Sequence, residues 1–348
     1  MIKFFRTIRK KLIEQQNVRK YTIYAIGEIL LVVIGILIAL QINNWNEKKK
    51  NLEAVTNIIL ELETELINNY EHANLVLGFW SVQDSLSKRV IYDQLTIDDY
   101  RKNDLLSIVS TNWFVYMPDM ENLNLLLENE TYADDRLKPV ISTAKRLRNT
   151  GNLLDEQWTI LRRNLDENLA TVVRNIGLVR SDSLSMARSY EYLLTDPDYK
   201  RSVELNWVKI QNYYDYISRY RAQTIALLST IKVVQEDYDP EELETLYAEI
   251  GMKPFKAYDC VQDFFERNNE LRSGYLIGNV SSEVVHLSII NDGKVSGSYT
   301  LLPYQFRHTR SEYAGLDGDY TVIAEQTDAQ GNCIERFIAV NKGYLIIN

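Results

Sequence analysis

The chain has 348 residues, of which 45% are apolar and 25% charged, a composition that excludes a largely disordered protein. Its length allows two domains at about 150 residues each. A formal net charge of −9 argues against a general nucleic-acid-binding protein, so we expect no nucleic acid among its partners.

Residues 1–20 form a basic cytoplasmic tail, in which seven Lys or Arg residues stand against one acid. Residues 21–42 are predicted to form a transmembrane helix, because the twenty nearly uncharged residues from Tyr21 to Leu40 can span a hydrocarbon core about 30 Å thick. The excess of cations before the helix keeps the N-terminus in the cytoplasm. We therefore expect a single-pass protein of the inner (cytoplasmic) membrane, with the bulk of the chain in the periplasm.

Two other interpretations of this segment stay open. A cleaved signal peptide is disfavoured because the apolar stretch is long and no small-residue cleavage site follows it. A buried core helix is disfavoured because residues 29–40 have no polar face.

Glu28 is the one carboxylate inside the apolar stretch. At about 100° per residue, Glu28, Gly35 and Ala39 fall on one narrow helix face. Small residues let two helices approach, and a carboxyl group can then hydrogen-bond across the contact. This pattern predicts a helix–helix contact in the membrane and a homo-oligomer formed through the anchor. The alternatives are a Glu28 side chain that snorkels to the interface and a proton or ion path, which one helix cannot form alone.

The segments "MIKFFRTIRKKLIEQ" and "KYTIYAIGEILLVVIGILIALQINNWNE" resemble the N-terminal signature of a family of uncharacterised bacterial single-pass membrane proteins. The similarity is specific over about residues 1–50 and looser to about residue 250. It implies a membrane-anchored, mainly helical protein without a known activity, and no functional residue is transferred from it.

Residues 43–252 are predicted to form a helical stalk and bundle. Apolar residues after the anchor recur at alternating steps of three and four, which is typical of a coiled coil or a bundle seam. These residues are Leu52, Val55, Ile59, Leu62 and Leu66. Thr96, Asp196 and Asp239 are predicted helix N-caps, the last two because a proline follows each.

Four aromatic residues lie at helical spacing in this region: Trp207, Tyr213, Tyr216 and Tyr220. Such a stripe is more often bundle core, with the hydroxyl groups reaching its rim. The alternative is an aromatic groove for a ligand or a peptide.

The period of the apolar residues changes after Gly251. We assign 253–272 to a linker or a last helix and 273–348 to a small antiparallel β-sandwich, because short runs rich in β-branched and aromatic residues alternate with turn signals. The predicted fold class is thus mainly α, with one transmembrane helix, an extended helical bundle and this β module. Cys260 and Cys333 form one bridge or remain two free thiols, which their spacing cannot decide.

Residues 279–340 resemble the β domain of the von Hippel–Lindau protein in the order of four motifs. These are Asp292–Gly293, Tyr299–Pro303, Tyr313–Gly315 and Gly331–Cys333. The resemblance implies a peptide-binding β fold without catalysis. The histidine and tryptophan that follow the third motif in that family are missing here, so no peptide-binding residue is transferred.

No Walker A loop, dinucleotide-binding glycine motif, nucleophile elbow or HExxH zinc motif occurs in the sequence. We therefore predict no catalytic, cofactor-binding or metal site, no cofactor and no enzyme. The expected function is a membrane-tethered periplasmic interaction or scaffold protein, with the lipid bilayer and an unidentified protein as partners. The alternatives are a ligand-sensing or regulatory subunit of a membrane complex and an enzyme without a recognised motif. The β module either docks a partner by strand addition or caps the bundle.

Overall fold

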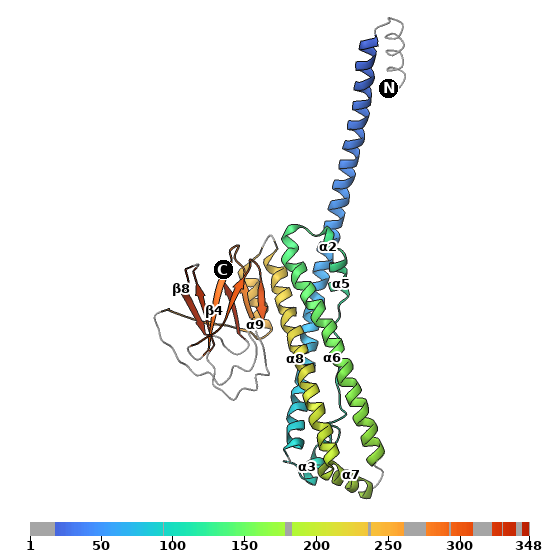
Figure 1. The fold of residues 1–348 in the computed structure, drawn as a ribbon, viewed down its shortest axis with the longest axis vertical. Helices are drawn as coiled ribbons and strands as arrows, with labels where there is room; N and C mark the ends of the chain where they lie inside the picture. Colours follow the sequence, from blue (N-terminus) through green and yellow to red (C-terminus); the bar gives the residue numbers. More distant parts are fainter. Residues whose placement is uncertain are drawn as a thin grey trace. The chain divides into compact units, whose positions relative to one another are not determined.

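A computed structural model shows a mainly α protein with a small C-terminal β region of two sheets (Figure 1), which confirms the predicted fold class. The chain divides into two compact units, Met1–Asn57 and Ile58–Asn348. The structure describes residues 18–92, 94–177, 183–235, 238–260, 276–291, 294–308, 322–328, 330–338 and 343–347. Most of the predicted basic tail lies outside these residues.

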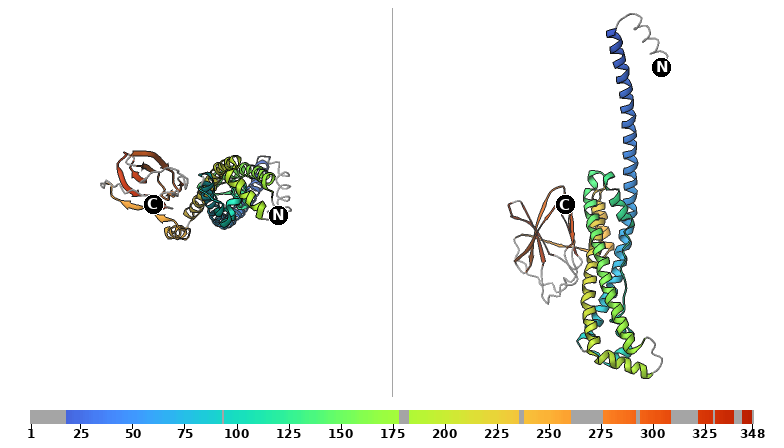
Figure 2. Two further views of the ribbon diagram at one scale, coloured as in Figure 1. Left: turned by 90° about the horizontal axis from the view of Figure 1, so that it is seen from below. Right: turned by 45° about the vertical axis from the view of Figure 1, so that its right-hand side comes forward.

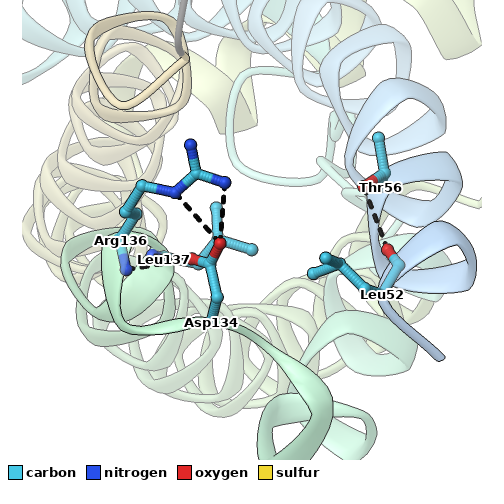
Figure 3. A network of polar contacts seen from close by, with 5 residues as sticks. All are labelled: Leu52, Thr56, Asp134, Arg136 and Leu137. Carbon is cyan, nitrogen blue, oxygen red and sulfur yellow. Dashed lines mark hydrogen bonds and ion pairs between the residues drawn. The ribbon is translucent and has the colours of Figure 1, made fainter. Parts of the chain in front are cut away.

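The first helix, α2 (Val18–Ile91), has 74 residues. From Ile26 onwards it contains a stretch long and apolar enough to cross a membrane, and no side chain of that stretch is buried in the described structure. Leu31 is 68% exposed and Leu37 58%, which argues against a helix buried in a soluble core. This part of α2 is therefore a candidate membrane span. Further along, Thr56 Oγ1 donates a hydrogen bond to the Leu52 carbonyl oxygen at 3.0 Å (Figure 3).

The second unit contains a helical bundle, in which the long helices α6 and α8 lie side by side (Figures 1 and 2). Its further helices are α3 (Ile97–Lys102), α4 (Asp104–Ser107), α5 (Glu121–Glu128), η1 (Glu130–Tyr132), η2 (Asp135–Leu137), α6 (Lys138–Ile176), α7 (Ser183–Thr195), α8 (Pro197–Val233) and α9 (Pro240–Glu249). The seam residues Ile59, Leu62 and Leu66 of α2 are buried. A coiled coil between copies of the chain stays a prediction.

Side-chain caps fix where several helices begin. Thr96 accepts a hydrogen bond from the Asp99 amide at 3.4 Å, and Asp99 accepts one from the Thr96 amide at 2.9 Å, which is a capping box. Asp196 and Asp239 each accept from a backbone amide in the first turn of the helix that follows. All three predicted N-caps are confirmed.

Asp134 is the N-cap of η2, and the sequence analysis did not predict this cap. Its carboxylate accepts from the Arg136 and Leu137 amides and also from the Arg136 guanidinium at 2.8 and 3.0 Å (Figure 3).

The β region consists of two sheets that pack around one apolar core. The strands are β1 (Lys253–Pro254), β2 (Lys256–Tyr258), β3 (Leu276–Asn279), β4 (Val285–Asn291), β5 (Lys294–Leu301), β6 (Phe306–His308), β7 (Val322–Thr327), β8 (Cys333–Ile338) and β9 (Gly343–Ile347). One sheet has the order β2-β8-β7-β4-β5 and is antiparallel throughout. The other has the order β1-β9-β3-β6 and is mixed, because β9 runs parallel to both β1 and β3.

Two details of the β region correct the sequence prediction. The β1-β9-β3-β6 sheet is mixed rather than antiparallel, and both sheets take an edge strand from 253–258, which we had assigned to a linker or helix. The reason is that β1 and β2 pair with β9 and β8, about 80–90 residues further along the chain. A pairing of such separation leaves no hairpin signal in the local sequence.

Gly278 in β3 leaves room for an aromatic ring of the neighbouring strand β6. A Cβ atom at this position would overlap the ring of Phe306 on the neighbouring strand β6. Glycine is therefore required here by the close packing of an aromatic ring rather than by its backbone angles.

A disulfide joins Cys260, just after β2, to Cys333 at the start of β8. The two cysteines are 73 positions apart in the sequence. Of the two states that this spacing leaves open, one bridge or two free thiols, the structure shows the bridge.

The β region and the bundle share an apolar core within the second unit. Ile225 and Val233 of α8 and Tyr247 of α9 lie in one cluster with Leu276 of β3 and Phe306 of β6. The β region is thus packed on the bundle through buried side chains.

Candidate functional site

The three predicted contact residues of the anchor lie on the exposed part of α2. Gly35 and Ala39 are exposed and Glu28 is half-buried. A Cβ atom at Gly35 would meet no other described atom within 4 Å. The space beside Gly35 is therefore open within one copy of the chain.

The four predicted aromatic residues do not share one surface. Tyr213 and Tyr220 are fully buried in the bundle, whereas Trp207 and Tyr216 are half-buried. The Tyr213 ring lies 5.9 Å from Trp80 and 5.6 Å from Trp158 between ring centres. Two of the four are thus core residues.

Tyr213 also holds an irregular segment against the bundle. Its hydroxyl accepts a hydrogen bond from the Tyr116 amide at 2.8 Å, and the Tyr116 hydroxyl donates to the Asn69 carbonyl at 2.9 Å. Burial raises the pKa of Tyr213 above its usual range, and that of Tyr100 to about 12. Both hydroxyl groups therefore stay protonated.

Asp84 on α2 is a polar centre that sequence reasoning missed. Its carboxylate accepts from Trp207 Nε1 at 2.6 Å, from Gln211 Nε2 at 2.7 Å and from Lys88 Nζ at 2.9 Å. The pair of Asp84 with Lys88 follows the i,i+4 pattern and was visible in the sequence. Trp207 and Gln211 lie on α8, far along the chain, and gave no signal. Trp207 is thus a hydrogen-bond donor to Asp84 in this polar cluster.

Glu65 is a second buried carboxylate of α2. It accepts from the amides of Asn122 at 2.6 Å and Leu123 at 3.3 Å, the first turn of α5. Burial raises the pKa of Glu65, while these two hydrogen bonds oppose the rise. Because its oxygens are used by the backbone of α5, Glu65 positions a helix and is not available for chemistry.

An open cleft of about 400 Å³ lies where α6 and α8 meet the β region. Its wall carries three arginines from three elements: Arg146 of α6, Arg219 of α8 and Arg307 of β6. Arg219 Nη2 donates to Asp215 Oδ2 at 2.6 Å. In the part of the chain that the structure describes, no carboxylate pairs with either Arg146 or Arg307.

Neutral groups hold the two other arginines. Arg146 Nη2 donates to Thr143 Oγ1 at 3.1 Å, and the Arg307 guanidinium lies 5.7 Å from the centre of the Tyr299 ring. Partial burial lowers the pKa of Arg146, and the positive charge of Arg307 lowers it further. The cleft therefore carries two positive charges that pair with no carboxylate among the residues whose positions are described.

No group of three or more His, Cys, Asp or Glu side chains that could hold a metal ion occurs among the residues with described positions.

Comparison with known families gives one match. Residues 28–150 match the model of a family of unknown function, DUF6090. The match spans about a third of the chain. It includes Glu65, Asp84 and Arg146, whereas Arg219 and Arg307 lie beyond it. No curated protein and no solved structure matches significantly.

The match agrees with the resemblance to a family without a known activity. The resemblance of residues 279–340 to the von Hippel–Lindau β domain stays a prediction. Two of its motifs, Asp292–Gly293 and Tyr313–Gly315, lie outside the described residues.

Proposed function

We propose that this protein is tethered in the inner membrane by α2 and that its exported body binds a protein partner. The observation that carries the proposal is that one continuous helix contains both the candidate membrane span and buried residues of the bundle. Such a helix would tether the folded second unit to the membrane.

Two independent features support export of the body. The cations before the span favour a cytoplasmic N-terminus. The Cys260–Cys333 disulfide favours an oxidising compartment on the other side, because disulfides rarely persist in the cytosol. In a bacterial cell these conditions describe the periplasm.

Binding rather than catalysis is supported by what the perturbed groups do. Strongly shifted pKa values in a cleft point to catalytic groups. Here the raised values of Tyr213 and Glu65 belong to side chains that hold backbone amides inside the bundle. The proposed role needs no cofactor and no enzymatic step.

The β5 strand is the proposed docking edge. It has eight residues and pairs, among the strands that the structure describes, with β4 alone. An unpaired strand edge can accept a strand of a partner, with main-chain hydrogen bonds providing affinity. Val295 on β5 is 67% exposed.

Recovery of a partner tests the proposal. The full chain, purified from detergent-solubilised membranes, is expected to retain one protein at stoichiometric amount. Val295→Lys should reduce its recovery, because a charge on an edge strand opposes pairing. Ile334→Lys is the matched control, since Ile334 is 57% exposed on β8, which lies between β2 and β7. Absence of a stoichiometric protein contradicts the proposed function, and equal loss in both variants contradicts the β5 edge.

A second candidate function is a ligand-sensing subunit of a membrane complex. The observation that favours it is the arginine-lined cleft between the bundle and the β region.

A further inference from the structure

The cleft between α6, α8 and β6 has a charge imbalance that its own residues do not correct. Three guanidinium groups and one carboxylate line it, and that carboxylate already pairs with Arg219. Arg146 and Arg307 come from the bundle and the β region, so folding itself brings two like charges to one cleft. Like charges that no anion separates oppose the packing of these two parts.

The same cleft holds polar atoms that lack partners. Ser218, Arg219 and Gln223 line it, and each has a buried side-chain nitrogen or oxygen without a hydrogen-bond partner in the described structure. Ser218 is only 8% exposed. Buried polar atoms are almost always satisfied in folded proteins, by protein groups or by water, so three such residues beside two unpaired cations provide hydrogen-bonding partners for a polar ligand.

The arginines are already oriented for such a ligand. Thr143 holds Arg146 through a hydrogen bond, Tyr299 stacks near Arg307, and Asp215 holds Arg219. A planar guanidinium offers parallel N–H donors that match the oxygens of carboxylate and phosphate groups. The volume of the cleft, about 400 Å³, lies within the range of small-molecule sites, roughly 300–1,000 Å³.

We propose that this cleft binds a small oxyanion with two negative charges, a phosphate or a dicarboxylate, between Arg146 of the bundle and Arg307 of the β region. The ligand neutralises the two unpaired guanidinium groups and joins α6 to β6. The cleft includes the Tyr299 side chain of β5, whereas partner docking would use the main chain of that strand. Anion binding is tested at Arg146 and Arg307 and docking at Val295, so either can fail without the other.

Thermal unfolding of the full chain in detergent micelles tests the proposal, with inorganic phosphate and succinate as probes and sodium chloride at equal ionic strength as reference. A ligand that binds only the folded state raises the unfolding temperature with its concentration. We expect phosphate, succinate or both to do so beyond the chloride reference. The probe that acts identifies which of the two oxyanion classes the cleft accepts.

Arg146→Gln and Arg307→Gln should each weaken the apparent affinity for the active probe about tenfold or more, which is the loss of one charge-assisted hydrogen-bonding group. Arg163→Gln is the matched control. It removes an exposed arginine from the same helix as Arg146, and Arg163 does not line the cleft.

A second measurement separates loss of binding from loss of folding. Without an added anion, Arg146→Gln and Arg307→Gln should unfold at temperatures no lower than the wild type, because each removes a repulsion. Three results overturn the proposal: no shift beyond chloride with either probe, a shift unaffected by both cleft variants, or an equal loss of the shift in Arg163→Gln.

Discussion

Asp84 illustrates how one carboxylate organises a helix pair. It receives hydrogen bonds from Trp207 and Gln211 of α8 and from Lys88 of its own helix. Its side chain is only 16% exposed, so these donors replace most of the water that a free carboxylate would bind. Removing a partly buried acceptor leaves its donors unsatisfied, which costs more than the hydrogen bonds themselves contribute.

We expect Asp84→Ala to lower the free energy of unfolding by about 1–3 kcal/mol, because the Trp207 indole N–H loses its acceptor. Asp84→Asn should cost less, since the amide oxygen can still accept. Urea unfolding of the solubilised chain, followed by tryptophan fluorescence, measures both changes.

Asp166→Ala is the control for Asp84. Asp166 is 71% exposed and lies 4.0 Å from Arg162, so its removal should change the free energy of unfolding by no more than about 0.5 kcal/mol. Equal effects of the two alanine variants would contradict the role assigned to Asp84.

Residues were predictable where their partners are local. Thr96, Asp196 and Asp239 bind amides two or three residues away, so the cap pattern identified them. Asp84 and Glu65 bind groups on other helices, and the three arginines of the cleft come from elements up to 161 positions apart in the numbering. No pattern in the sequence brings such residues together before the fold is known.

At the scale of elements, α2 contains both the candidate membrane span and residues of the bundle core. No side chain of its apolar stretch is buried in the described structure, whereas Ile59, Leu62 and Leu66 are buried. The open space beside Gly35 makes it suitable for a test, because a Cβ atom there meets no atom of the described residues within 4 Å. Any effect of such a change on association then reports a contact with another helix.

Gly35→Ile should weaken self-association of the full chain in membranes if Glu28, Gly35 and Ala39 form a contact face, because the added side chain separates the two helices. Glu28→Gln should weaken it less, since an amide still hydrogen-bonds. Cross-linking in native membranes measures the oligomeric fraction.

Gly27→Ile provides the comparison for Gly35→Ile. Gly27 also has open space around its Cβ position, and at 100° per residue it lies about 80–120° from the proposed face. Unchanged self-association in Gly35→Ile and Glu28→Gln would contradict the proposed contact face. An equal loss of self-association in Gly27→Ile would contradict it as well.

Elements with a strong local period were predicted well, and those that depend on distant pairing were not. The long helices α6 and α8 follow from amphipathic runs with proline near each start. The strands β1 and β2 have two and three residues and exist only because β9 and β8 provide partners. Their short length gives no alternation that sequence reasoning could detect.

At the scale of the whole molecule, the bridge between Cys260 and Cys333 provides a test of the proposed export of the body. Under the proposed topology the segment after α2 reaches an oxidising compartment, where such a disulfide forms and persists. The topology of the chain and the redox state of its cysteines therefore have to agree.

Reporter fusions after Lys50 should be active only with a reporter that requires the periplasm, and the recovered chain should retain residues 1–40. In the same membranes, a thiol-reactive mass label should modify Cys260 and Cys333 only after reduction, because the disulfide protects both sulfur atoms. Cytoplasmic reporter activity, labelling without reduction, or a mature chain that starts near Asn43 would contradict the proposed topology.

If the body is exported as proposed, the position of β9 sets the order in which it can assemble. β9 lies between β1 and β3 and pairs with both, yet it is synthesised after every other strand. All the long helices of the bundle are complete by Val233, so they can pack while the rest of the chain is still being translated. In that topology, β1 and β3 lack the strand that joins them and expose unpaired edges until Gly343–Ile347 has crossed the membrane. Assembly of this body therefore finishes only after translocation of its last strand, and aggregation is most probable in the interval before that event.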